Sequence, residues 1–87
     1  IMIVKLNESE RSELFLQASD SAGQGGFQSL MVKLQDKFND KTMTLLLTKQ
    51  DLERIPRYAF NYSKGGWESR LRRIFARVLG PDLQGKG

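Results

Sequence analysis

The chain carries the same order of local signals twice, and this repetition constrains the fold more than any other feature. A short aliphatic run at residues 3–6 returns at residues 44–47, and runs of this length and composition are typical of strands. Each run is followed by a helix-start signal, then by a glycine pair, then by an amphipathic stretch. We therefore expect two diverged copies of a strand–helix–helix unit, over residues 2–38 and 43–79.

The helix-start signals are of one kind in both copies. Asn7 is followed three residues later by Glu10, and Thr48 is followed three residues later by Asp51. The first side chain of such a pair can accept a hydrogen bond from a first-turn N–H, and the acid can accept one in return. A helix is thus predicted to begin after Asn7 and another after Thr48.

A second helix is predicted in each copy directly after its glycine pair. Residues 25–26 precede Phe27, residues 65–66 precede Trp67, and apolar residues then recur every three or four positions, which predicts one buried helix face. The two apolar stripes are Phe27, Leu30, Met31, Leu34 and Phe38, and Trp67, Leu71, Ile74, Phe75 and Val78. We expect the glycines to serve the backbone at a tight corner, because the lysine and hydroxyl of a phosphate-binding loop are missing.

Breaks in the pattern set the expected boundaries. Pro56 lies inside the helix expected over residues 49–62 and predicts a kink there. Residues 80–81, glycine then proline, are a helix stop signal. We expect a single small α+β domain over residues 1–80, with a two-stranded ribbon packed against four helices, and a flexible tail over residues 81–87. The alternative is two unrelated helical hairpins, and the strands could pair within one chain or between two.

Composition excludes several classes of function. The chain has 87 residues and neither cysteine nor histidine, which removes disulfides, zinc–thiolate sites and the commonest general base and metal ligand. No spacing assigns catalytic roles, so we expect no enzyme, no cofactor and no metal. No apolar run is long enough to span a bilayer and no secretory signal is present, so we expect a cytoplasmic protein without a membrane partner. Ile1 before Met2 fits either a natural start at Met2 or a segment of a longer chain.

Charge is distributed unevenly along the chain. The formal net charge is +4, with −2 on residues 1–40 and +6 on residues 41–87. An asymmetry of this kind often accompanies binding to an anionic partner.

The last predicted helix carries most of the positive charge. At 100° per residue, Arg70, Arg73 and Arg77 fall along one flank of its apolar stripe, and Arg72 falls on the other flank. An arginine ladder on a helix entered through a glycine turn resembles the second helix of a helix–turn–helix unit in outline. The sequence therefore predicts binding to DNA or RNA, since a guanidinium can bond phosphate bidentately. The predicted contacts are Arg70, Arg73, Arg77, Arg72, Lys64 and Arg57.

Other interpretations of the same residues stay open. The arginines could form a solvated face, or they could pair with the acids of the first copy, namely Glu8, Glu10, Glu13 and Asp36. The alternative function is a protein-interaction module (a regulator, an inhibitor or a homodimer) that docks on an acidic surface through the same basic and aromatic region around Tyr58 and Phe60. Trp67 is expected in the core, and base stacking would require its exposure.

Overall fold

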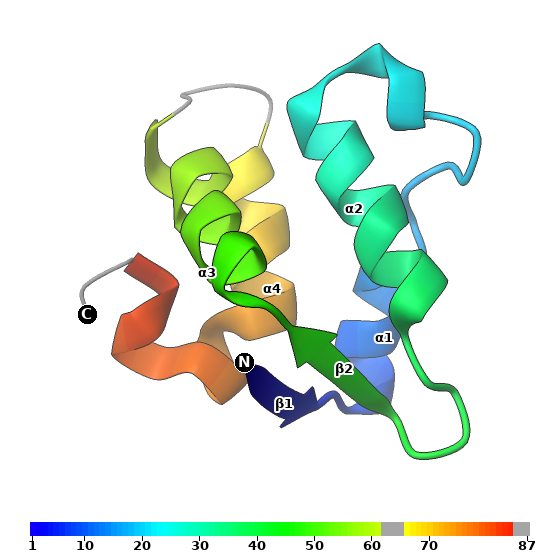
Figure 1. The fold of residues 1–87 in the computed structure, drawn as a ribbon, viewed down its shortest axis with the longest axis vertical. Helices are drawn as coiled ribbons and strands as arrows, with labels where there is room; N and C mark the ends of the chain where they lie inside the picture. The colour runs from blue at the N-terminus through cyan, green and yellow to red at the C-terminus, as the bar shows by residue number, and fades with distance from the viewer. Residues whose placement is uncertain (62–65, 85–87) are drawn as a thin grey trace.

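The two predicted strands and four predicted helices are present in the computed structural model, which describes residues 1–61 and 66–84 (Figure 1). The strands and α-helices are β1 Met2–Lys5, α1 Glu8–Leu14, α2 Gly26–Lys37, β2 Thr44–Leu47, α3 Lys49–Pro56 and α4 Trp67–Leu79. Three short turns of other helical types complete the described elements: η1 Ala22–Gln24, η2 Arg57–Asn61 and η3 Gly80–Gln84. The chain is thus a small α+β domain.

The strands pair with each other antiparallel within the one chain. Met2 is opposite Leu47 and Val4 is opposite Leu45, and these pairs point inward, so that Val4, Leu45 and Leu47 are buried. The pairs between them point outward, which follows from the two-residue period of a strand. A two-stranded sheet is only marginally stable alone, so the helices on its inner face supply the rest of the core.

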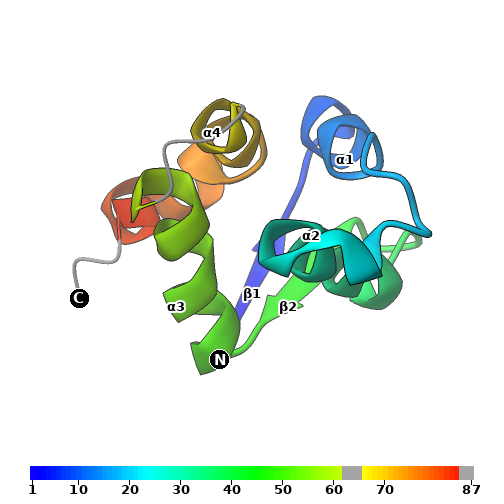
Figure 2. The ribbon, with the colours of Figure 1, turned by 90° about the horizontal axis from the view of Figure 1, so that it is seen from above.

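The helices of the two halves pack against each other across the molecule. Figure 1 shows α3 and α4 on one side and α1 and α2 on the other, with the sheet beneath, and Figure 2 gives the view from above. The first helix of each half meets the second helix of the other half: α1 packs on α4, and α3 packs on α2. The largest fully buried side chains are Phe27, Phe75, Leu6, Leu14, Leu30, Met31, Leu34, Leu45, Leu47, Ile55, Leu71 and Ile74. These include most of both predicted stripes.

Both predicted capping boxes are confirmed. The Asn7 Oδ1 atom accepts from the Glu10 N–H at 2.8 Å, and Glu10 Oε1 accepts from the Asn7 N–H at 2.8 Å. Thr48 and Asp51 make the same exchange at 3.2 and 3.0 Å. Each box satisfies N–H groups that a helix N-terminus leaves without partners, so both first helices begin where the sequence predicts.

The ends of the helices and of the packed region differ from expectation in three places. The first helix does not continue to the glycine pair, because α1 ends at Leu14; beyond it the Ser21 hydroxyl donates to the Ala18 carbonyl at 2.6 Å, and short polar side chains of this kind compete with helical hydrogen bonds. At Pro56, α3 ends and the wider π-helical turn η2 takes over. At the C-terminal end, η3 places Leu83 in the core, so the packed part of the chain extends beyond residue 80.

Candidate binding surfaces

The predicted arginine flank of α4 faces α1 of the same chain. Arg73 forms two hydrogen bonds to Glu13, from Nε to Oε1 at 3.0 Å and from Nη2 to Oε2 at 3.3 Å. Arg77 also bonds in a bidentate manner to Glu10, at 3.0 and 2.7 Å. Arg70 donates to Gln17 Oε1 at 2.8 Å. We call these three contacts the α1–α4 ladder.

The spacing of the ladder explains why it forms. Its members on α4 lie at positions 70, 73 and 77. Their partners follow in antiparallel order: Glu13 and Glu10 are three residues apart on α1, and Gln17 lies three residues beyond the end of α1. Side chains three and four residues apart share one helix face. The ladder therefore joins the acidic half of the chain to its basic half.

The acids of the ladder are largely shielded from solvent: the side chains of Glu13 and Glu10 are 13% and 6% exposed. Glu10 is buried, and burial alone would raise its pKa, but the hydrogen bonds from Arg77 and from the Asn7 N–H lower the pKa below its ordinary value. The hydrogen bond to Glu10 raises the pKa of Arg77. Sequence reasoning missed this burial because the N3 position of a capping box is usually at the surface.

Arg72 and Arg57, two further predicted contacts, take no part in the ladder. Arg72 pairs with Glu68 one turn earlier on α4 at 2.8 Å, and its guanidinium lies 5.3 Å from the centre of the Phe60 ring. Arg57 is exposed and forms no ion pair with any described residue. Lys64 lies outside the described residues. The structure thus brings Arg70, Arg73 and Arg77 together and leaves Arg72 on a different flank.

A second buried carboxylate, that of Asp51, lies at the N-terminal cap of α3. Asp51 is fully buried and accepts hydrogen bonds from Lys33, at 3.0 Å, and from Lys37, both on α2. Burial would raise the pKa of Asp51, but Lys37, Lys33 and the Thr48 cap lower it far below its ordinary value. The two lysines lie four residues apart on α2, so they share one helix face. This spacing is the sequence feature that indicates a common acidic partner.

An aromatic cluster joins the two predicted second helices. The rings of Phe27 and Trp67 stack with centroids 4.8 Å apart and planes 7° apart, and Tyr58 meets both edge to face. Phe27 is fully buried, and Trp67 is partly buried and packs against the core cluster. The expectation that Trp67 packs in the core is therefore confirmed.

Two of the predicted glycines have distinct structural reasons. A Cβ on Gly26 would lie 1.9 Å from the Tyr58 hydroxyl, so a glycine permits the close approach of that ring. Gly66 precedes α4 with φ of +79°, a left-handed conformation that favours glycine. The prediction that the glycines serve the backbone is confirmed at Gly66, whereas Gly26 instead makes room for a side chain.

The outer face of the sheet is apolar, which the sequence analysis did not predict. Ile3 is 68% exposed and lies directly opposite Leu46, which is 40% exposed, and Ile1 is 88% exposed. Lys5 and Thr44 form the next outward pair. We call Ile1, Ile3 and Leu46 the apolar sheet face. Because β2 contains three consecutive leucines, the sequence does not indicate which of them points outward.

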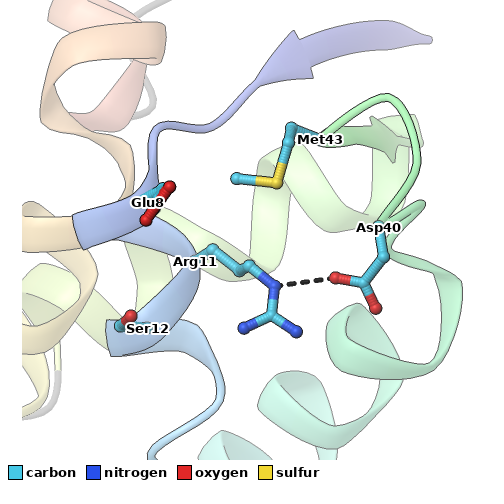
Figure 3. A pocket seen from close by; sticks show the side chains of 5 residues that line it. All are labelled: Glu8, Arg11, Ser12, Asp40 and Met43. Atoms are coloured by element: carbon cyan, nitrogen blue, oxygen red, sulfur yellow. Dashed lines mark hydrogen bonds and ion pairs between the residues drawn. The ribbon is translucent and has the colours of Figure 1, made fainter.

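A surface hollow of about 360 Å³ lies between α1 and the turn before β2 (Figure 3). Glu8, Arg11, Ser12, Asp40 and Met43 line it, and Arg11 spans it to Asp40 at 2.7 Å. That hydrogen bond raises the pKa of Arg11. The pairing engages two of the charged side chains that line the hollow.

The described residues hold no site of two further kinds, for metal ions or for a membrane span. Within residues 1–61 and 66–84, no group of three acidic, histidine or cysteine side chains is placed to hold a metal ion. None of the helices described is long and apolar enough to cross a membrane. Comparison with protein-family models, with curated proteins and with solved structures finds no match to this chain.

Proposed function

We propose that this chain is a small protein-interaction domain that docks on an acidic partner through the apolar sheet face. The observation that carries the proposal is the outward pair Ile3 and Leu46, 68% and 40% exposed on a sheet open to solvent. An antiparallel sheet with one solvated face normally places polar residues outward. Apolar side chains grouped at such a position mark an interaction site.

The charge around this face favours an acidic partner. Lys5 lies in the outward pair beside Ile3, and no acid occurs within either strand. Lys5 forms no ion pair within the described part of the chain, whereas the arginine flank of α4 is engaged by α1. Complementary charge around an apolar centre would raise the association rate and select the partner.

The test compares baits that differ on the sheet face only. Proteins captured by the wild-type chain, by an I3S/L46S variant and by an L16S control are identified, and the best candidate is purified and titrated against all three. Leu16 is 70% exposed but lies beyond α1, away from the sheet. We expect loss of affinity of roughly tenfold or more with I3S/L46S and little change with L16S. Equal binding by all three chains would refute the proposal.

Nucleic-acid binding through α4 is the second candidate. What favours it is that Arg73 and Arg77 keep 56% and 55% of their side chains exposed while bonded to α1. Exposed guanidinium groups could still meet phosphates of DNA or RNA, with Arg57 in support. The test is binding to short duplex DNA, single-stranded DNA and RNA across a salt series. Binding too weak to measure at low salt would exclude this function.

Two variants of equal net charge test whether nucleic acid binds the arginines of α4. In E10Q/E13Q the ladder loses both of its negative charges, and in D20N/D36N two exposed acids outside the ladder are neutralised. Each variant loses two negative charges, so the net charge rises by two in both. If nucleic acid uses the arginine flank, E10Q/E13Q should gain more affinity than D20N/D36N and show the steeper salt dependence. Equal gains would mean that only net charge matters.

We also propose that the two halves are diverged copies of one unit, residues 2–38 and 43–79. Under an offset of 41 residues the strand pair Met2–Leu47 maps onto the pair of Leu6 with Met43, whose N···O distance is 2.8 Å. The equivalent aromatics Phe27 and Trp67 stack on each other. A tandem duplicate of residues 43–79 would test this: a cooperatively folding, helix-rich product is expected, and an unfolded product would count against equivalence.

The ion pairs at the two caps support the same proposal. Glu10 and Asp51 occupy the same capping-box position, and each is bonded by a base from the second helix of the other half, Arg77 and Lys37. These two bases are themselves equivalent, 40 residues apart. Each half therefore holds the first helix of the other half in the same manner.

A further inference from the structure

We propose that two copies of this chain exchange halves, so that residues 1–38 of one copy pack on residues 44–84 of the other and form a two-fold dimer. The partner is a second copy, and the interface is the one that already joins the halves of the monomer. This inference does not rest on the apolar sheet face or on binding by α4.

The contacts between the halves carry most of the core. They include the pairing of β1 with β2, the packing of α1 on α4 and of α2 on α3, and the stack of Phe27 on Trp67. The ion pairs of Glu10, Glu13 and Asp51 also cross from one half to the other. All of these contacts can form equally well between two chains, because none of them depends on the peptide that links the halves.

Each half also has contacts of its own, which would hold it together during an exchange. In the first half, the buried Gln35 amide donates to the carbonyls of Leu14 and Gln17, at 3.0 and 2.8 Å, and so ties α2 to the end of α1. In the second half, α4 packs on both η2 and η3. A half can therefore move as a unit.

The link between the halves is a tight turn that stores backbone strain. Asn39 Oδ1 accepts from the N–H groups of Lys41 and Thr42, at 2.9 and 3.2 Å. Met43 has φ of +60°, the one described non-glycine residue with positive φ, a conformation that is unfavourable for a side chain of this size. Asp40 in the turn is held by Arg11 (Figure 3). An extended link would relieve the strain at Met43, and short strained hinge loops promote exchange.

A change in the length of the turn tests the balance between monomer and dimer. Deletion of residues 40–42 leaves too little chain to reverse direction between α2 and β2, so we expect a dimer by light scattering on a sizing column. Insertion of Gly-Gly-Ser after residue 41, or M43G, should shift the chain toward monomer, since either change relaxes the closed turn. A deletion variant that stays a folded monomer would overturn the proposal.

A pair of charge-reversed chains tests the exchange where the deletion variant fails to fold. In E13R the new arginine faces Arg73, and in R73E the new glutamate faces Glu13, so each chain alone carries a like-charge contact. An exchanged heterodimer of the two restores an opposite pair in both of its halves. After the chains are unfolded and refolded together, native mass spectrometry should show heterodimer well above the proportion of about one-half that random pairing gives.

The matched control uses charge reversals at exposed residues outside the ladder. D36R and R57E reverse one acid and one arginine, as E13R and R73E do, but at positions that form no ion pair with any described residue. A mixture of these two control chains should show no enrichment of heterodimer. If E13R with R73E gives no more heterodimer than this control, the halves do not exchange and the proposal is wrong.

Discussion

Replacement of Asp51 by asparagine should be among the most destabilising single changes in the chain. The carboxylate is fully buried, accepts hydrogen bonds from Lys33 and Lys37, and forms the acidic half of the α3 capping box with Thr48. The change keeps the shape of the side chain and removes its charge. Both lysines then lose their anionic partner, while one cap oxygen remains.

The magnitude follows from the contacts that are weakened. A lost cap contact costs about 0.5–2 kcal/mol, and a hydrogen bond to a charged group contributes about 1.5–3 kcal/mol. Lys33 and Lys37 keep 40% and 23% of their side chains exposed, so water can hydrate them when the anion is gone. We therefore expect a loss of about 2–4 kcal/mol, toward the low end for breaking a buried pair.

Urea unfolding followed by Trp67 fluorescence measures this loss, because Trp67 stacks on Phe27 in the core. With a slope of about 1–1.5 kcal/mol per molar urea, the midpoint should fall by roughly 2 M. The control is D20N, an exposed site, with an expected change below about 0.5 kcal/mol. If D51N proves too unstable to fold, K37M is the milder test, with an expected loss of about 1–2 kcal/mol. A D51N midpoint equal to that of D20N would refute the reasoning.

Three further outcomes are expected. The pKa values of both cap carboxylates are lowered by folding, so their stabilisation is complete above about pH 5 and is lost as the pH falls below their ordinary values. Urea midpoints at pH 7 and pH 5 should therefore be nearly equal and the midpoint at pH 3 clearly lower, and an equal midpoint at pH 3 would contradict the ion pairing. G26A should destabilise by about 1–3 kcal/mol by displacing Tyr58, whereas G23A, with open space around it, should be nearly neutral in thermal unfolding. G66A should lose about 1 kcal/mol at its positive φ, and G66N should lose less, by the same unfolding measurement.

Local signals in the sequence predicted the parts of the fold that local chemistry determines. The helices after Asn7 and Thr48 begin as expected, because a hydrogen bond between a side-chain oxygen and an N–H three residues away determines where each helix starts. The early end of α1 at Leu14 was missed because the spacing of apolar residues carries no signal for the polar hydrogen bonds that follow it.

The candidate surfaces depend on tertiary contacts that no local signal determines. The sequence left three fates open for Arg73 and Arg77: contact with an anionic partner, a solvated face, or pairing with acids of the first half. The antiparallel placement of α1 on α4 brings them to Glu13 and Glu10. The exposure of Leu46 likewise depends on strand register, because a shift of one residue would turn it inward.

The ladder sets a condition on any function of α4. A phosphate or a partner carboxylate can bond Arg73 or Arg77 fully only by sharing or displacing Glu13 or Glu10, so part of the binding free energy would be lost from the packing of α1. A partner at the sheet face meets no such competition, because Ile3 and Leu46 have no apolar side chain over them to displace. Neutralising Glu10 and Glu13 should therefore strengthen binding at α4 and leave binding at the sheet face nearly unchanged. This difference separates the two proposed functions in a single pair of titrations.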